Sequence, residues 1–306
     1  MPIKHIILAL IVAVVWGCNF IFVKLGVQEI PPLFLCALRF FLASVPAIFF
    51  VKWPSASFKM VASYGVVMFG LQFSFIFTSL SVGMTAGMAS LLSQVQIFFS
   101  IFFAAIFLGE RPTIWQIFGA IVAFTGIILV VMHLGNSSMT LPGFLLVIAA
   151  AISWGLGNLI TKKMSCSNMI AVVVWGSFIS CFPLLLVSCL IEGPEKILFS
   201  LHHFSWIAAI SLAYIVYIST WVGYGLWNWL INHHPVASVV PFTLLVPIVG
   251  IVSSVFIMGE ALQTWKLIAS ALVIAGLCIN IVGPRLLKKK IKIKSPQCEL
   301  QETIVS

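Results

Sequence analysis

Long stretches without a charged side chain constrain this sequence more than any other feature. Residues 60–109 and 112–161 each run for 50 residues without Asp, Glu, Lys or Arg, and the run 197–259 is longer still. An α-helix needs about 20 apolar residues to cross a bilayer, so each run holds two helical spans joined by a short turn. Only 8% of the residues are charged, against about 25% in soluble domains, which excludes that class.

The remaining charge-poor runs add one span each. They are residues 5–23, 30–51, 164–191 and 267–284, and only Arg39 interrupts the second of them. Strand alternation is absent, and backbone groups that face lipid must form their hydrogen bonds internally. The sequence therefore predicts an all-α integral membrane protein with ten transmembrane helices.

The basic residues indicate how these helices are oriented. Of the 16 Lys and Arg residues, twelve fall on the side of the N-terminus, three on the other side, and Arg39 lies within the second span. Cytoplasmic loops carry the excess of Lys and Arg, so both termini are expected in the cytoplasm, with the chain in the inner membrane of the cell. The net charge of +9 then faces anionic lipid, and a nucleic-acid partner is not expected.

The chain also contains an internal repeat. The Gly-Glu pair that ends in Glu110 recurs 150 residues later at Glu260, and the same shift superposes Trp115 on Trp265. Five helices therefore repeat twice, in a first domain at 1–133 and a second at 141–283. The second half carries 11 extra residues, placed around 192–204, and a basic cytoplasmic tail follows at 284–306.

An odd number of helices in each repeat forces the two halves into opposite orientations. Inverted repeats are an architecture of transporters, whose substrate binds near mid-membrane between the halves. The alternative is that duplication provides only a stable scaffold. An integral membrane enzyme, a channel and a structural membrane protein are further alternatives.

Several segments resemble a known family. They are AVVWGCNFIFVKLG at 13–26, PPLFLCALRFFLASVPAIFF at 31–50, AGMASLLSQVQIFFS at 86–100, LGERP at 108–112, SWGLGNLITKK at 153–163 and VGYGLWNWL at 222–230. Over nearly its whole length the chain is similar to the EamA type of the drug/metabolite transporter superfamily, and these segments look most like the bacterial exporters of O-acetylserine and cysteine. The resemblance implies export of small amino-acid-like metabolites by alternating access. Export of another metabolite or drug remains open, because such families share folds across substrates.

Aromatic residues of the eighth span are the first candidates for the substrate site. At 100° per residue, Tyr217, Trp221 and Tyr224 share one face of a regular helix. Such a face suits the apolar part of a zwitterion, while the polar tips of the side chains bind its ends. The alternative, an interfacial aromatic belt, fits residues nearer the helix ends.

The repeat supplies a second set of candidates. Trp16 and Asn19 on the first helix correspond to Trp154 and Asn158 on the sixth. A carboxamide both donates and accepts hydrogen bonds, which suits an amino-acid headgroup, and packing against a neighbouring helix is an equal alternative. Gln94 shares a face with small residues on the fourth helix. The predicted substrate-binding residues are thus Trp16, Asn19, Gln94, Trp154, Asn158, Tyr217, Trp221 and Tyr224.

Other polar residues receive mainly structural roles. Pro241 and Pro247 predict a kinked ninth helix. Glu110 and Glu260 lie at helix ends and are expected to act as structural brackets. Arg39 lies within a span, where a guanidinium should face carbonyls, a glutamate or an anionic group, and a structural role is favoured over contact with the substrate carboxylate.

Several kinds of chemistry are not expected. The chain has no Asp, its six His lie at segment ends, and nucleotide-binding loops are absent. No catalytic residue, metal site or cofactor is therefore predicted, and the chain is expected not to be an enzyme. The expected partners are a small-molecule substrate and the lipid bilayer, with no obligatory protein partner. No Glu lies at membrane depth, which predicts that no bound carboxylate couples protons to transport.

Overall fold

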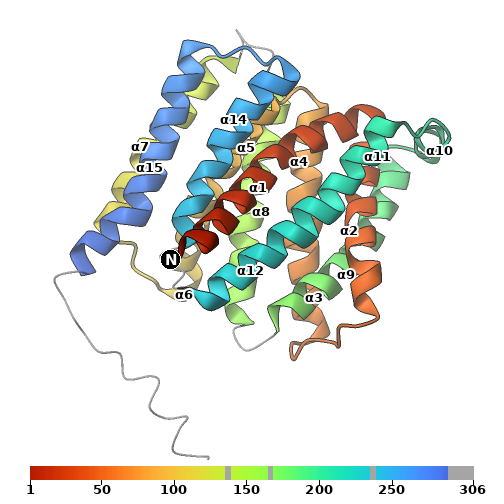
Figure 1. Ribbon diagram of the computed structural model, residues 1–306, viewed down its shortest axis with the longest axis horizontal. Coiled ribbons are helices and arrows are strands. Elements are labelled where there is room, and N and C mark those ends of the chain that lie inside the picture. Colours follow the sequence, from red (N-terminus) through yellow and green to blue (C-terminus); the bar gives the residue numbers. More distant parts are fainter. Residues whose placement is uncertain (135–138, 165–167, 235–238, 289–306) are drawn as a thin grey trace, which may run out of the picture.

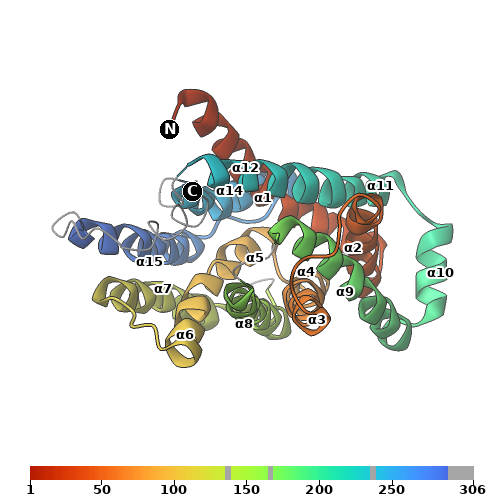
Figure 2. The same ribbon diagram turned by 90° about the horizontal axis from the view of Figure 1, so that it is seen from below.

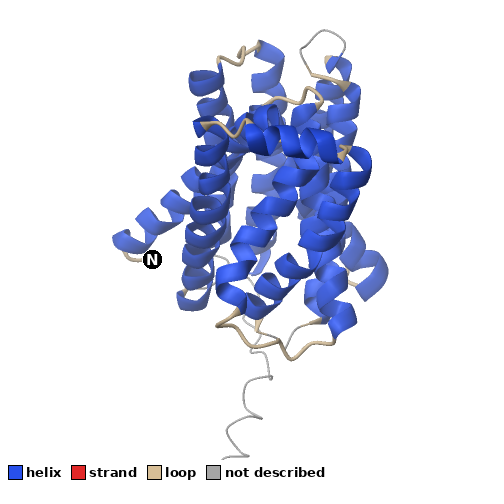
Figure 3. Ribbon diagram, turned by 90° about the vertical axis from the view of Figure 1, so that its right-hand side faces the viewer, coloured by secondary structure: helices blue, strands red, loops and turns tan. Residues whose placement is uncertain are grey.

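Helices form all the regular structure in the computed structural model, which describes residues 1–134, 139–164, 168–234 and 239–288 (Figures 1 and 3). In the first half the elements are α1 (Ile3–Glu29), α2 (Pro32–Ile48), α3 (Phe58–Tyr64), η1 (Gly65–Leu71), α4 (Gln72–Ser81), α5 (Ala86–Ser93), α6 (Gln96–Leu108) and α7 (Ile114–Met132). In the second half they are α8 (Leu141–Lys163), α9 (Met169–Ile191), α10 (Pro194–His202), α11 (Trp206–Ala213), η3 (Tyr214–Gly223), α12 (Tyr224–His233), η4 (Val240–Leu244), α14 (Leu245–Met258) and α15 (Thr264–Lys288).

Eight continuous helical segments of this described part are long and apolar enough to cross a membrane. They are Ile3–Glu29, Phe58–Ser81, Ala86–Leu108, Ile114–Met132, Leu141–Lys163, Met169–Ile191, Trp206–Trp227 and Thr264–Pro284. Two shorter apolar helices, Pro32–Ile48 and Phe242–Met258, occupy the remaining predicted spans. At 17 residues, α2 is about 26 Å long, slightly less than the roughly 30 Å hydrocarbon core.

The helices form two layers that exchange elements between the halves. In Figure 2, α1 lies in one layer with α11, α12, α14 and α15, whereas α8 lies in the other with α3, α6 and α7. The packing agrees, because α1 contacts α14, α11 and η3, and α8 contacts α4 and α6. Each half therefore contributes its first helix to the layer built by the other half.

Helix α7 ends the first half and α15 ends the second, and these two helices pack against each other along their length (Figure 1). Glycines permit this close approach: a Cβ at Gly276 would lie 2.4 Å from the Gly119 carbonyl oxygen, and one at Gly119 would lie 2.6 Å from that of Gly276. Real Cβ atoms do not come so near to backbone oxygen, so the seam depends on these two residues. Small residues of this kind let helices approach when both are surrounded by lipid.

Irregular backbone recurs at matching places in the two halves. Shifted by 150 residues, the π-helical segment η1 falls on 215–221, inside the π-helical segment η3. The turn that separates α5 from α6 at Gln94 and Val95 falls on 244–245, where the 3-10 segment η4 gives way to α14. A break was expected only near the prolines of the ninth span. The corresponding break at Gln94, with no proline nearby, was not expected.

The expected insertion around 192–204 forms the short helix α10, which lies apart from the long helices in Figure 2. Its Ile197 and Ser200 are buried, whereas Leu198 and Phe199 are more than half exposed. The predicted basic tail falls mostly within 289–306, outside the described residues.

Candidate substrate site

Trp16 on α1 and Tyr224 on α12 are in contact. Their ring centroids lie 5.2 Å apart, and the Trp16 ring lies 5.3 Å from that of Trp227. The Trp16 indole Nε1 donates a hydrogen bond of 3.2 Å to the Ser219 carbonyl oxygen. Two of the predicted residues therefore meet where helices of the two halves pack together.

Tyr217 and Trp221 do not join this contact. They are 50% and 43% exposed on η3, whereas Tyr224 is partly buried against Trp16. The expectation of one aromatic face assumed a regular α-helix, but η3 is π-helical, and its wider turn changes which residues share a face. The structure therefore brings Tyr224 to Trp16 and does not bring Tyr217 or Trp221 into this contact.

Asn19 lies on α1, one turn beyond Trp16. Its side chain is 9% exposed, and its Oδ1 has no hydrogen-bond partner within the part of the chain that the structure describes. Buried polar atoms are nearly always hydrogen-bonded, so an unused one needs an explanation. A carbonyl oxygen can accept a hydrogen bond from an ammonium group, which keeps Asn19 among the candidates.

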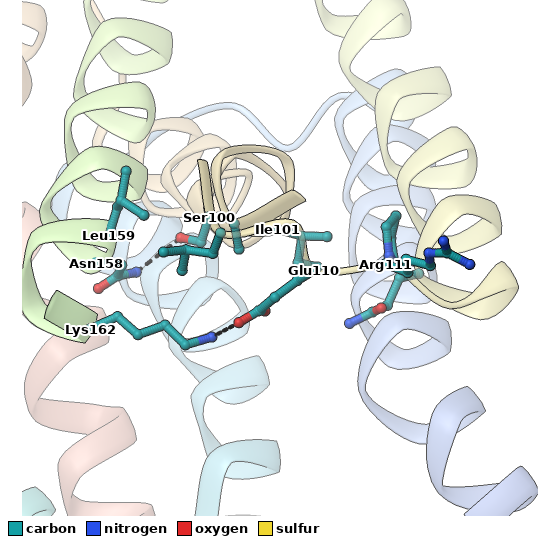
Figure 4. Close-up of a pocket in the computed structure, with 11 residues that line it drawn as sticks. Ser100, Ile101, Glu110, Arg111, Asn158, Leu159 and Lys162 are labelled. Carbon is teal, nitrogen blue, oxygen red and sulfur yellow. Dashed lines mark hydrogen bonds and ion pairs between the residues drawn. The ribbon is translucent and has the colours of Figure 1, made fainter. Parts of the chain in front are cut away.

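Asn158 has different surroundings. Its Nδ2 donates a hydrogen bond of 2.9 Å to the Ser100 hydroxyl, and it lines a pocket of about 240 Å³ together with Glu110 and Lys162 (Figure 4). Glu110 and Lys162 form an ion pair whose side chains are about half exposed. Trp154, four residues earlier on α8, is partly buried against the hydrophobic core. The two asparagines that the repeat aligns are therefore not equivalent in the structure.

Gln94 lies at the break between α5 and α6. Its side chain is 7% exposed, and its N–H bonds back to the Leu91 carbonyl three residues earlier, at 3.1 Å. One turn before it, the Ser90 hydroxyl donates to the Val246 carbonyl of α14 at 3.4 Å. Gln94 is thus buried where a broken helix of one half packs against the other half. Irregular backbone at membrane depth is tolerated where protein or a cavity surrounds it.

Arg39 is the residue whose surroundings differ most from expectation. It is 2% exposed, and its guanidinium carbon lies 4.3 Å from the Phe73 ring centroid and 5.4 Å from that of Phe40. Its Nη2 donates to the Thr220 hydroxyl at 3.4 Å. Within the described residues, no carboxylate forms an ion pair with Arg39, although a glutamate, an anionic group or carbonyls were expected there.

Two glutamates hold the first turns of helices in the other half. The Glu192 carboxylate, after α9, accepts from the N–H groups of Leu33 and Phe34 at 2.7 and 3.0 Å. The Glu260 carboxylate, after α14, accepts from the N–H groups at the start of α5. A carboxylate there satisfies N–H groups that have no partner within the helix and complements the helix dipole. Sequence reasoning did not single out Glu192, although it ends an apolar run as Glu110 and Glu260 do.

No group of three or more His, Cys, Asp or Glu side chains in the described ranges is placed to hold a metal ion. The candidate residues instead carry aromatic rings, carboxamides and, at Arg39, an enclosed guanidinium. Such groups bind and orient an organic molecule, because they supply apolar faces and hydrogen bonds. The fold defines a multi-pass helical membrane protein whose two halves share their irregular segments, an architecture found in transporters.

Comparison with known proteins identifies the family. Residues 3–132 and 141–282 each match the EamA-like transporter family. The chain is 38% identical over 283 residues to a probable amino-acid metabolite efflux pump of Salmonella typhimurium, covering 91% of this chain and 95% of that protein. It is 37% identical over 297 residues to the Escherichia coli protein of the same description, covering 95% and 99%.

The chain belongs to the EamA-like transporter family, so the resemblance seen in the sequence is confirmed. It is a membrane transporter and not an enzyme, and its partners are a small-molecule substrate and the membrane. A crystal structure of another protein matches with a TM-score of 0.62 at 17% identity, over 95% of this chain and 99% of that one. At this identity the similarity supports the fold alone.

Proposed function

We propose that this protein exports small amino-acid-like metabolites of the cysteine and O-acetylserine class across the inner membrane. Two relatives that cover almost the whole chain are described as probable amino-acid metabolite efflux pumps. The contact between Trp16 and Tyr224 suits a small zwitterion with a short apolar side chain. One turn further along α1, the buried carbonyl oxygen of Asn19 has no hydrogen-bond partner among the described residues. This contact between the halves is the observation that carries the proposal.

The mechanism in this proposal is alternating access between two inverted repeats of five spans each, 1–133 and 141–283. The repeated π-helical segments and helix breaks support it, because irregular helices at matching positions can give the halves two equivalent arrangements. Both termini are proposed to lie in the cytoplasm on the positive-inside rule. On this orientation, Glu192 and Glu260 lie at the external end of the molecule, and Glu110 at the cytoplasmic end.

Described contacts join the two halves at both ends of the molecule. The ammonium group of Lys24 donates to the carbonyl oxygens of Leu80 and Met84 at 2.6 and 3.0 Å, and Glu260 holds the start of α5 nearby. At the cytoplasmic end, Glu110 forms an exposed ion pair with Lys162 of the second half, and the Trp175 indole donates a hydrogen bond to the Val51 carbonyl oxygen at 3.1 Å.

Counterflow in proteoliposomes tests the function. Vesicles that contain the purified protein and unlabelled L-cysteine, kept reduced, should take up labelled L-cysteine faster than vesicles without protein. O-acetylserine should compete, and a large unrelated solute should not. Saturable exchange identifies a carrier, whereas uptake proportional to concentration without exchange would support a channel and contradict the proposal.

A further inference from the structure

Arg39 is an enclosed positive charge well inside α2. It lies seven residues after the start of the helix at Pro32, or about 10 Å along its axis. The rings of Phe73, Phe40 and Phe77 surround its guanidinium at 4.3, 5.4 and 5.8 Å. Aromatic faces attract a cation, but they accept no conventional hydrogen bond. They therefore hold the guanidinium in place without satisfying its N–H groups.

Most of the hydrogen-bonding capacity of this guanidinium is unused. A guanidinium has five N–H donors, and the one described hydrogen bond, from Nη2 to the Thr220 hydroxyl, is long at 3.4 Å. Nε and Nη1 are buried and have no partner among the described residues. A charged group at membrane depth is costly unless it is paired, and it commonly marks the path of a substrate or ion.

The contacts of Arg39 place it beside the candidate site. Its partner Thr220 lies in η3, next to Ser219, whose carbonyl oxygen accepts the Trp16 indole hydrogen bond. Arg39 belongs to the first half of the chain and η3 to the second, so it too lies where the halves meet. Glu192, from the second half, fixes the first turn of α2 and therefore the height of Arg39 in the membrane.

We propose that Arg39 binds the carboxylate of the transported amino acid, which would accept hydrogen bonds from the unpartnered guanidinium N–H groups. This inference rests on the proposed function and adds the residue that recognises the anionic end of the substrate. A carboxylate matches a guanidinium in charge and in planar geometry. The ammonium end of the substrate is left to the Trp16 and Tyr224 rings, whose faces attract cations.

The experiment compares L-cysteine with cysteamine, which is cysteine without its carboxylate. Both are added as competitors of labelled L-cysteine counterflow under reducing conditions, and their stabilisation of the purified protein is measured by thermal unfolding, which needs no transport. The wild type should prefer cysteine to cysteamine at least tenfold in both assays. Arg39→Gln should weaken the binding of cysteine at least tenfold and change the binding of cysteamine by less than twofold. The preference for cysteine then disappears.

Two further variants keep the test decisive. Arg111→Gln makes the same substitution at an exposed arginine and should retain the full preference. Arg39→Lys keeps the charge and should lower the preference at least threefold, because an ammonium group cannot reproduce the planar donors of a guanidinium. If Arg39→Gln does not fold, the lysine variant decides the outcome.

The results separate the inference from the proposed function. A wild type that prefers cysteine, with Arg39 variants that keep this preference unchanged, overturns the inference and leaves the proposed function intact. A wild type that binds and transports neither cysteine nor O-acetylserine overturns the proposed function and the inference with it. If the Arg39 variants lose the preference for cysteine while the wild type and Arg111→Gln keep it, the result supports both the inference and the proposed function.

Discussion

Glu260→Gln should loosen the external end of the transporter, where this carboxylate of the second half holds the start of α5 in the first half. The Glu260 Oε1 accepts from the Ala86 N–H at 2.8 Å, and Oε2 accepts from the Gly87 N–H at 3.4 Å. The carboxylate also attracts the ammonium groups of Lys24 and Lys266. Glutamine keeps one carbonyl acceptor but loses the negative charge and the second oxygen.

The expected magnitude follows from these contacts. A hydrogen bond to a charged group contributes about 1.5–3 kcal/mol, and the shorter bond retains part of this when its acceptor is an amide. The bond at 3.4 Å is near the geometric limit and contributes little. With about 0.3–1 kcal/mol from the charge at the start of α5, the total loss is about 2 kcal/mol, or roughly a 30-fold shift between closed and open states.

The assay measures how often this end opens. Met84 is fully buried, and its carbonyl oxygen accepts a hydrogen bond from Lys24. With Met84→Cys in a background without the native cysteines, a membrane-impermeant maleimide should label the Glu260→Gln variant roughly 30-fold faster than its parent. Glu110→Gln, the corresponding change in the other repeat, is the control and should leave this rate unchanged. Equal labelling rates with and without Glu260 would refute the role given to this carboxylate.

Three further predictions concern the seam, the aromatic site and coupling. Gly276→Ala places a Cβ 2.4 Å from the Gly119 carbonyl oxygen and should destabilise the purified protein by about 1–3 kcal/mol. Gly225→Ala, whose Cβ meets no atom within 4 Å, should not destabilise it, and equal melting temperatures would contradict the packing. Tyr224→Ala should reduce cysteine counterflow at least tenfold. Trp221→Ala, on the exposed side of η3, should stay within twofold of wild type. A larger loss of counterflow in Trp221→Ala than in Tyr224→Ala would contradict the proposed site. Proteoliposomes with equal substrate on both sides should not accumulate it after a pH step, because no glutamate is expected at membrane depth, and accumulation abolished by a protonophore would overturn this.

Most of the helices could be predicted because a lipid bilayer requires long apolar segments. The charge-free run 60–109 was expected to hold two spans and a turn, and it forms the helical segments Phe58–Ser81 and Ala86–Leu108. Hydropathy locates such helices because the bilayer requires both apolar side chains and internal hydrogen bonds. Hydropathy does not specify whether each N–H bonds to the carbonyl four or five residues earlier, so the π-helical segments were not predicted. The break at Gln94 was missed for the same reason.

The candidate site was predicted in part. Trp16 and Tyr224 were singled out separately, and the structure brings them into contact. Tyr217 and Trp221 were placed with them by the geometry of a regular helix, which η3 does not follow. Arg39 was recognised as unusual, but its neighbours come from α4 and η3. Only the folded chain shows that aromatic rings surround it and that, among the residues the structure describes, no carboxylate forms an ion pair with it.

The central claim is that this chain is a carrier for cysteine-class metabolites, and counterflow of labelled L-cysteine in proteoliposomes tests it most directly. The account predicts saturable uptake that depends on unlabelled L-cysteine inside the vesicles, is inhibited by O-acetylserine and is at least tenfold weaker in the Arg39→Gln variant. Uptake by the wild type no faster than in protein-free vesicles, with unlabelled L-cysteine or O-acetylserine inside, would contradict it.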